Sequence, residues 1–467
     1  MRCLFVALLL IGGCSLAPDY QRPDVTDVPQ QWVEDPALTI LPIIEYGWWR
    51  QFGNAELDSL VETALQRSPA LGMAVASVSQ SRAAAGGTSS ARWPSVNIGG
   101  SSTRSRMNLS QFGMPGSIYN TLYSASATTS YELDLWGRLS DSNKAAWAQV
   151  AASELDLQTV RRTLIADVVR TWLEVRQFDG AVGLSQKTVT SQKKNLAMVT
   201  DRYNSGVVTA LDVHLARQAL SSSEAVLVVR RSDLSRTKRR LEILCGLYPT
   251  GKAGNGAALS KLPELMKIPA GLPSELLEKR PDIAAAESRL VAAYAQVGSA
   301  RAGLFPRLSL TGEAGGRSGI LSELLNDAPS IWTLAANISM PLLNRGQQMS
   351  QVKSAHAQVE QAEANYVQTV LRAFGEVENL LASDEFLQQQ RRFVRESVNS
   401  AESALGLSRD RYQRGLGTLM MVLESERRLW QSKTELLGVE RACRTNRVNL
   451  LLALGGSWDT RENSDEK

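Results

Sequence analysis

The chain has 467 residues, a formal net charge of +4, 4 Cys, 2 His and 6% aromatic residues. This length predicts two to four domains or one architecture built twice, and the scarcity of aromatic side chains favours long helices. His214 and His356 lie far apart and no Cys has a paired spacing, which excludes an obvious zinc site, a Cys/His catalytic pair or a redox CxxC motif; the small charge does not indicate nucleic-acid binding.

Residues 1–13 are predicted to be a secretory signal that ends before a cysteine. Arg2 precedes an apolar run from Leu4 to Ile11 that is too short to span a bilayer. The segment Ile11-Gly12-Gly13-Cys14 resembles the bacterial lipoprotein box, which implies cleavage before Cys14 and acylation of that residue. Ser15, rather than Asp, follows the cysteine, and in lipoproteins of this kind that points to the outer membrane. An ordinary signal peptide with an incidental cysteine is the alternative.

Segments rich in proline separate the remaining parts of the chain. Residues 14–50 are expected to form an extended strap rather than a domain. Residues 51–248 and 273–456 are predicted to be two repeats, joined by a linker at 249–272 and followed by a polar tail at 457–467. The prediction of one architecture written twice rests on comparing the chain with itself.

The two repeats match at a nearly constant offset. An offset of 212 relates Pro69 to Pro281, and an offset of 209 relates Asp201-Arg202-Tyr203 to Asp410-Arg411-Tyr412. The offset therefore changes by three residues between Pro94 and Gly137 of the first copy. Strands of membrane length are predicted in this segment of each copy.

The predicted strands alternate between two faces. From Tyr119 to Leu135 a less polar face carries tyrosines near both ends, and only Leu122 interrupts the polar face. The partner strand is expected at about Ser95 to Arg106, and the second copy repeats the alternation over 307–314 and 332–340. The alternative is a soluble β-hairpin with one solvent-exposed face. Four strands cannot close a membrane barrel, so membrane strands would require an oligomer, and three chains would supply twelve.

Long helices are predicted after each hairpin. Residues 138–203 would extend about 100 Å as a helix at about 1.5 Å per residue, and the second copy carries a heptad repeat from Val352 to Leu380. Gly206 and Gly415 follow these helices and are expected to allow tight reversals. Each copy is therefore expected to run helix, hairpin, long helix, tight turn and returning helix.

No catalytic constellation is apparent in the sequence. It has no P-loop or other nucleotide-binding signature. Cys245 and Cys443 lie in apolar helical contexts and are expected to be buried thiols rather than a disulfide. The chain is therefore not expected to be an enzyme or to bind a cofactor or a metal.

With these features the chain resembles the outer-membrane efflux protein family, the TolC-like outer-membrane factors, in the lipoprotein branch of tripartite RND-type efflux pumps. The motifs that carry the resemblance span the mature chain in order: Cys14-Ser15-Leu16-Ala17-Pro18-Asp19-Tyr20, Trp48-Trp49, Tyr131-Glu132-Leu133-Asp134-Leu135-Trp136-Gly137-Arg138, Arg280-Pro281-Asp282-Ile283, Phe305-Pro306, Tyr412, Gly415 and Glu424-Ser425-Glu426-Arg427. The resemblance implies a mainly α fold with transmembrane β-strands. Three chains would form a 12-stranded outer-membrane β-barrel, four strands per chain, continued by a long periplasmic α-helical barrel with an equatorial zone near residues 249–272.

The resemblance implies a passive exit duct. An inner-membrane RND-type pump, joined by a periplasmic adaptor, would expel drugs, toxic compounds or metal ions through a homotrimer that is anchored in outer-membrane lipid at Cys14 and extends into the periplasm. No nucleic-acid partner is implied. The alternatives are the exit duct of a type I protein secretion system and a periplasmic coiled-coil lipoprotein scaffold without a pore. The lipoprotein box and the Arg280-Pro281-Asp282-Ile283 motif favour efflux.

The resemblance also implies a gate and a docking surface at the periplasmic turns. The gate positions are Asp212, Tyr412, Met421 and Glu424, and the adaptor-docking positions are Gly206, Thr209, Leu211, Gly415, Thr418 and Leu419. Met421 stands where family members carry an acidic residue, and Gly417 where some carry an arginine. Three Met421 side chains would form an apolar constriction, whereas a ring of Glu424 carboxylates would attract cations. Simple packing between helices is the alternative for Met421.

Overall fold

The computed structural model describes residues 15–24, 32–33, 47–263, 280–326 and 330–455; Cys14 and the tail predicted at 457–467 lie outside these ranges. The chain divides into two compact units, and each unit draws on both halves of the sequence. The first unit comprises Met1–Asp24, Ser77–Glu154 and Ala285–Val367, and the second comprises Val25–Ala76, Leu155–Ala284 and Gln368–Lys467.

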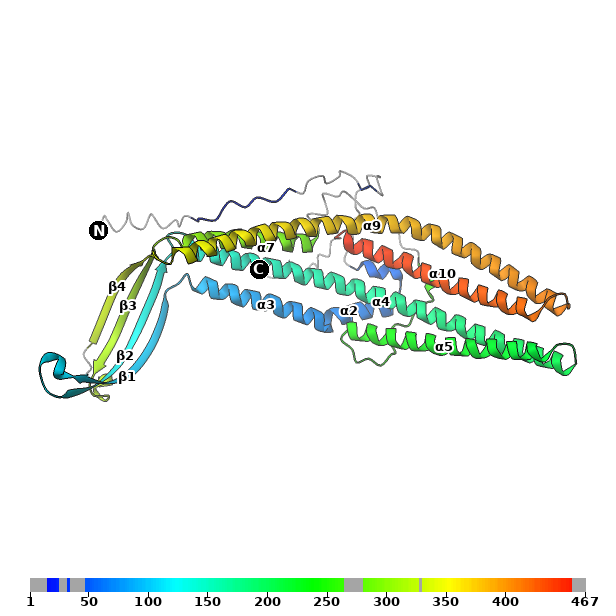
Figure 1. Cartoon of the computed structure of the whole chain (residues 1–467), viewed down its shortest axis with the longest axis horizontal. Helices are drawn as coiled ribbons and strands as arrows, with labels where there is room; N and C mark the ends of the chain where they lie inside the picture. The colour runs from blue at the N-terminus through cyan, green and yellow to red at the C-terminus, as the bar shows by residue number, and fades with distance from the viewer. Residues whose placement is uncertain (1–14, 25–31, 34–46, 264–279, 327–329, 456–467) are drawn as a thin grey trace. The chain divides into compact units, whose positions relative to one another are not determined.

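A four-stranded antiparallel sheet in the order β1-β2-β3-β4 dominates the first unit (Figure 1). Its strands are β1 (Ser95–Asn108), β2 (Ser117–Leu133), β3 (Arg307–Ser318) and β4 (Ser330–Ser339). Both predicted hairpins are therefore present, one from each half of the chain. Two short helices, η2 (Leu109–Phe112) and α8 (Glu323–Asn326), lie in the connections within the hairpins.

The register of the sheet separates an apolar face from a polar face. Directly paired residues share a face; one row across all four strands is Ile98, Ala127, Ala314 and Trp332. The next row, on the opposite face, is Asn97, Thr128, Glu313 and Thr333. The alternation predicted from the sequence is confirmed, and the face that holds Ile98 and Trp332 is called the apolar face below.

Capping interactions define the start of the long helix α4 (Arg138–Asn204). The Asp134 carboxylate accepts hydrogen bonds from the backbone N–H groups of Leu139 (3.0 Å) and Ser140 (2.7 Å), which lack partners within the helix. Arg138 forms a two-pronged pair with Glu132 at the end of β2, with N···O distances of 2.8 and 2.7 Å. The predicted 138–203 helix is thus confirmed.

Two helices of the second copy pack together in the first unit. They are α7 (Pro281–Ala302) and α9 (Arg345–Gln413), which share an apolar cluster of Leu290, Val297, Ala355 and Val359. The heptad positions Val352, Val359, Tyr366 and Ala373 of α9 are all buried, and Leu380, the last position of the predicted row, is half-buried. The helix α3 (Pro69–Ser90) of the first copy is mostly exposed in the single chain.

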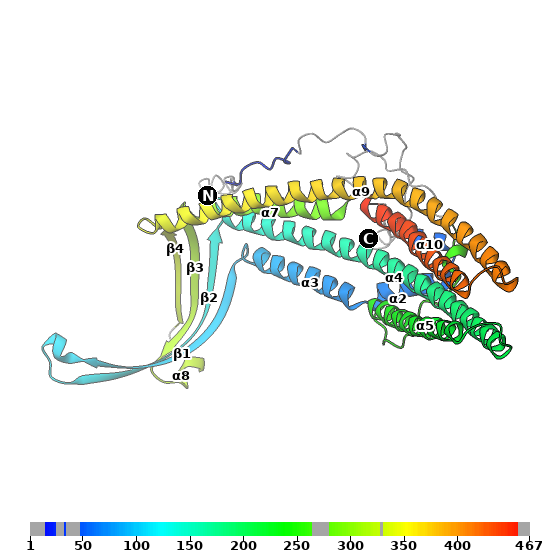
Figure 2. The ribbon, with the colours of Figure 1, turned by 45° about the vertical axis from the view of Figure 1, so that its right-hand side comes forward.

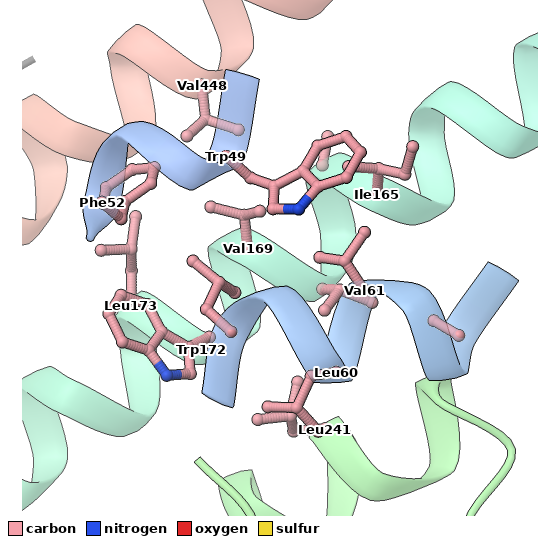
Figure 3. Close-up of a cluster of buried hydrophobic side chains, with 14 of the residues drawn as sticks. Trp49, Phe52, Leu60, Val61, Ile165, Val169, Trp172, Leu173, Leu241 and Val448 are labelled. Atoms are coloured by element: carbon pink, nitrogen blue, oxygen red, sulfur yellow. The ribbon is translucent and has the colours of Figure 1, made fainter. Parts of the chain in front are cut away.

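The second unit holds the largest hydrophobic core among the described residues (Figure 3). Its elements are the 3-10 helices η1 (Trp48–Phe52) and η3 (Leu259–Lys261), the helices α2 (Ala55–Arg67), α5 (Ala210–Leu244) and α10 (Leu419–Ala453), and part of α4. Trp49, Phe52 and Trp172 are almost completely buried there, packed against aliphatic side chains from α2, α5 and α10. This core joins the N-terminal segment to both repeats.

The end of α5 requires a glycine. Gly246 has φ of +69° and follows the C-cap residue Cys245. A Cβ at this position would lie 2.2 Å from the carbonyl oxygen of Arg67 at the end of α2. Close packing of α5 against α2 therefore depends on the missing side chain.

The described helices include none that is both long enough and apolar enough to cross a membrane.

Candidate functional site

Two helical hairpins, α4–α5 and α9–α10, reverse direction at glycines. Gly206 and Gly415 have φ of +72° and +74°. In each turn the glycine N–H donates to the carbonyl of the tyrosine three residues earlier, Tyr203 (2.9 Å) or Tyr412 (3.1 Å), and the following N–H donates to an arginine carbonyl. These bonds satisfy carbonyls at the helix end that lack partners within the helix, and the left-handed glycine makes the reversal possible. The predicted glycine turns are confirmed.

The two turns pack against each other within the second unit (Figure 1), and residues 199–216 and 405–422 are called the tip. The tip and the helix turns next to it share a small core of buried side chains: Val199, Ala216, Val398, Leu405, Tyr412, Leu419, Val422 and Leu429. Leu419, a predicted docking position, is only 1% exposed, so its side chain supports the tip from inside. Val207, Leu211 and Leu416 are apolar and exposed around it.

Tyr412 joins the two hairpins. Its buried ring lies 4.8 Å from the guanidinium carbon of Arg202 on α4, and Arg202 also donates to the Tyr412 carbonyl at 3.3 Å. Burial raises the pKa of Tyr412; the nearby Arg202 opposes the shift and Asp212 adds to it. Asp212 is thus close enough to Tyr412 to act on it electrostatically, and Arg202 links Tyr412 to the other hairpin.

Asp212 and Met421 occupy equivalent positions in the two copies, separated by the offset of 209. The Asp212 carboxylate accepts from the backbone N–H (3.1 Å) and the hydroxyl (3.0 Å) of Thr209, which caps the start of α5. Thr418 caps α10 at the equivalent place without a side-chain bond, because Met421 has no carboxylate. Met421 is 47% exposed, and its thioether takes no part in capping the helix.

Glu424 is paired with two arginines on its own helix. Its carboxylate accepts from Arg427 at 2.8 Å through two guanidinium nitrogens and from Arg428 at 2.7 Å. The two bonds from Arg427, and then the one from Arg428, lower the pKa of Glu424 to about 2. One carboxylate beside two guanidinium groups leaves a local positive charge, which opposes the cation attraction predicted for a Glu424 ring.

Glu426 is the most enclosed charged side chain of this region, with 0% exposure. Its carboxylate accepts hydrogen bonds from Ser191 (2.8 Å), Gln192 (2.8 Å) and Asn195 (3.0 Å), all on α4, and from Arg409 on α9. Three helices of two hairpins thus converge on one carboxylate. Sequence reasoning missed this network because the α4 partners lie more than 200 residues away in the chain.

A groove of about 830 Å³ runs along α4, α5 and α10 beside this network. Apolar side chains from all three helices line it, including Leu184, Val226 and Trp430, and Glu424 and Arg427 lie among its polar lining residues. The groove and the exposed apolar residues of the tip therefore offer a surface on which another helix could pack.

Comparison with known proteins identifies the architecture. The chain matches the family described as Outer membrane efflux protein over residues 60–247 and 272–456. It belongs to this family. The "Solvent efflux pump outer membrane protein SrpC" of Pseudomonas putida is 32% identical, covering 98% of each protein, and the "Cation efflux system protein CusC" of Escherichia coli O6:H1 is 30% identical, covering 97% of this chain and 98% of CusC.

A solved structure agrees with these relatives. The open state of the Neisseria gonorrhoeae MtrE outer membrane channel superposes with a TM-score of 0.84 at 26% identity, covering 95% of this chain and 99% of that one. The outer membrane efflux protein described here therefore has the fold of the TolC-like channels, mainly helical with four strands per chain. It is the channel component of an efflux system, through which exported compounds cross the outer membrane.

The structure describes two of the four cysteines of this efflux protein. Cys245 and Cys443 are buried free thiols, as predicted. Burial raises the pKa of the Cys245 thiol to about 11, so it stays protonated at physiological pH. In the described part of the chain, no group of three or more His, Cys, Asp or Glu side chains could hold a metal ion.

Proposed function

We propose that this outer membrane efflux protein is a homotrimeric passive exit duct, coupled through a periplasmic adaptor to an inner-membrane pump of the RND type. The observation that carries the proposal is one chain that combines a sheet with a single apolar face and a pair of glycine-turned helical hairpins. Among the strands that the structure describes, β1 and β4 each have one unpaired edge. Because open edges are costly in lipid, pairing β1 of one chain with β4 of the next would close a barrel of twelve strands in a trimer.

The tip is proposed as the docking surface for the adaptor. Val207, Leu211 and Leu416 are each at least 60% exposed, beside the glycine turns and the Thr209 and Thr418 caps. Apolar side chains in such a cluster are costly in water, and a helical hairpin of the adaptor would cover them. The groove along α4, α5 and α10 would receive the flank of that hairpin.

The closed state is proposed to resist ion flow by apolar narrowing at Met421. This side chain is exposed in the single chain and forms no cap, while Glu424 is neutralised by its own arginines. Three Met421 side chains around the threefold axis would exclude water from the constriction. Opening would require α10 to move away from α4, with loss of the Glu426 bonds.

The lipid anchor is proposed at Cys14, which lies outside the described residues. Its neighbour Ser15 donates to both oxygens of Asp141 at 2.8 and 3.0 Å. Asp141 is in the first turn of α4, which starts soon after β2 ends at Leu133. Adjacent Cα atoms are about 3.8 Å apart, so an acyl group on the residue before Ser15 would start close to this contact. It would then enter the membrane near the end of the sheet at which α4 begins.

The proposed cargo is small toxic compounds, the class to which the solvents and cations named for SrpC and CusC belong. Choice among them would rest with the pump, because a wide duct contacts its cargo weakly. No catalytic role is proposed for the chain.

Crosslinking and conductance together test the proposal. Purified protein should run as a heat-labile trimer in detergent and conduct ions in planar bilayers. In cells, Leu211→Cys should crosslink to the adaptor, whereas Tyr248→Cys, exposed beyond the other end of α5, should not. Gly206→Pro should abolish the Leu211→Cys crosslink while the trimer persists, because proline cannot reach a φ of +72°. Trimers that never conduct would support the scaffold alternative and overturn the duct.

A further inference from the structure

Strands β1 and β2 continue beyond the four-stranded sheet as a two-stranded ribbon, residues 103–108 paired with 117–122 (Figure 2). The last residue of β3, Ser318, pairs with Tyr123, so no further strand of the described residues lies beside this ribbon. It lies at the end of the sheet opposite the long helices. In an outer-membrane channel whose helices extend into the periplasm, this end faces the outer leaflet.

Two arginines of the ribbon surround one tyrosine. The guanidinium carbons of Arg104 and Arg106 lie 5.8 and 5.7 Å from the centre of the Tyr119 ring, close enough for cation–π attraction. All three side chains are exposed, and in the part of the chain that the structure describes neither arginine forms an ion pair. Two guanidinium groups held on one aromatic ring, with no carboxylate paired to them, can bind an anion.

The register places this cluster on the apolar face. Arg104 pairs with Thr121 and Arg106 with Tyr119, and these positions keep the parity of Ile98 and Ala127. The strand therefore turns the arginines toward the same side as the residues that would contact lipid. By contrast, Arg317 in β3 lies on the polar face, where it pairs with Glu313 at 3.5 Å.

The distance along β1 matches the thickness of a membrane. Ten residues separate Val96, near the start of the apolar face, from Arg106, which is about 34 Å at about 3.4 Å per residue. A strand tilt of about 40° reduces this to at most about 26 Å along the membrane normal, because the ribbon also bends away from the sheet (Figure 2); this compares with the apolar band of about 25 Å in outer-membrane barrels. The arginines therefore reach the level of the outer-leaflet headgroups.

We propose that Arg104, Arg106 and Tyr119 bind the phosphate groups of the anionic glycolipid of the outer leaflet. Each guanidinium offers a planar fork of N–H donors that matches two phosphate oxygens, and the tyrosine ring holds both forks in place. The apolar face below the cluster packs against the acyl chains of the same lipid. The inference rests on the sheet spanning the outer membrane in a trimeric barrel.

Lipid binding to the purified full-length trimer tests the site. The probe is bisphosphorylated lipid A, added to trimers in neutral phosphatidylcholine vesicles, with bound lipid counted by native mass spectrometry. The double variant Arg104→Gln/Arg106→Gln should lower the affinity at least tenfold. The matched control Arg317→Gln removes an arginine on the opposite face of the neighbouring part of the sheet and should change it less than twofold.

Further arms separate the sources of binding. Dephosphorylated lipid A should bind the wild type as weakly as the bisphosphorylated form binds the double variant, and phosphatidylglycerol should bind less tightly than lipid A. If the double variant fails to form trimers, Tyr119→Leu, which keeps both charges but removes the ring, should still lower the affinity. Equal binding by the double variant and Arg317→Gln, or equal binding of dephosphorylated lipid, would overturn the site. A conducting wild-type trimer without lipid A preference refutes this inference alone, whereas absence of a conducting trimer refutes the proposed duct.

Discussion

Replacing Glu426 by glutamine tests whether a buried carboxylate holds the two hairpins together. The substitution keeps the shape of the side chain but removes its charge. One oxygen of Glu426 accepts from Ser191 and Arg409, and the other accepts from the amides of Gln192 and Asn195. The new amide nitrogen therefore takes the place of an oxygen that accepts two hydrogen bonds, and both donors lose that acceptor.

The contacts set the size of the effect. A hydrogen bond to a charged group contributes about 1.5–3 kcal/mol, and a buried donor left unpaired costs about 1–3 kcal/mol. Arg409 is 44% exposed and is hydrated again when the ion pair is lost, so the loss of its bond contributes an energy at the low end of these ranges. A total of about 2–4 kcal/mol follows, less than the loss for a fully buried pair. About 3 kcal/mol shifts the balance between docked and separated hairpins by about 150-fold.

Hydrogen exchange and conductance provide the assay. In purified Glu426→Gln trimers, the backbone amides of α10 near residue 426 should exchange faster, while those of the sheet keep the wild-type rate. Basal conductance in planar bilayers should rise. Glu435→Gln, the same chemical change at an exposed position of α10, serves as the control. Exchange and conductance that are equal in the two variants would refute the role given to the network.

Three further results are expected. Met421→Ser should raise basal conductance of the closed channel by wetting the constriction, and an unchanged conductance would contradict the apolar gate. Gly246→Ala should lower the free energy of unfolding by about 2–5 kcal/mol in denaturant titrations, since its Cβ would lie 2.2 Å from the Arg67 carbonyl oxygen and the left-handed φ is strained. The control Gly183→Ala, where the new Cβ on α4 meets open space, should raise the free energy of unfolding by about 0.5–1 kcal/mol. Because burial raises the pKa of Cys245 to about 11, maleimide at pH 7.5 should label it after denaturation and not in the native trimer.

The local patterns of the sequence predicted much of the fold. The alternation over Tyr119–Leu135 predicted β2 and which of its residues share a face, because a sheet with one apolar face imposes a period of two. The heptad from Val352 to Ala373 is buried as a helix period requires. Gly206 and Gly415 end their helices because the turn needs a positive φ that other residues rarely adopt.

Contacts between distant segments could not be predicted in the same way. Ser15 meets Asp141, and Glu426 meets Asn195, through the packing of helices whose facing sides no local spacing reveals. The pairing of Glu424 with Arg427 and Arg428 is different, since spacings of three and four residues on a helix bring side chains together. That signal was present in the sequence, and it limits the cation attraction first expected of Glu424.

The Glu426 network also explains why the two hairpins are not interchangeable. The offset of 209 aligns Glu426 with Arg217 and Arg409 with Thr200, so the first copy cannot form the same ion pair. The amide donors Gln192 and Asn195 likewise align with Ala401 and Ala404. Apolar packing alone would allow either hairpin to take either place, because both copies bury similar aliphatic side chains at the tip. A carboxylate in one copy and its amide donors in the other make one arrangement stable, since any other placement of the hairpins separates the buried Glu426 carboxylate from Gln192 and Asn195.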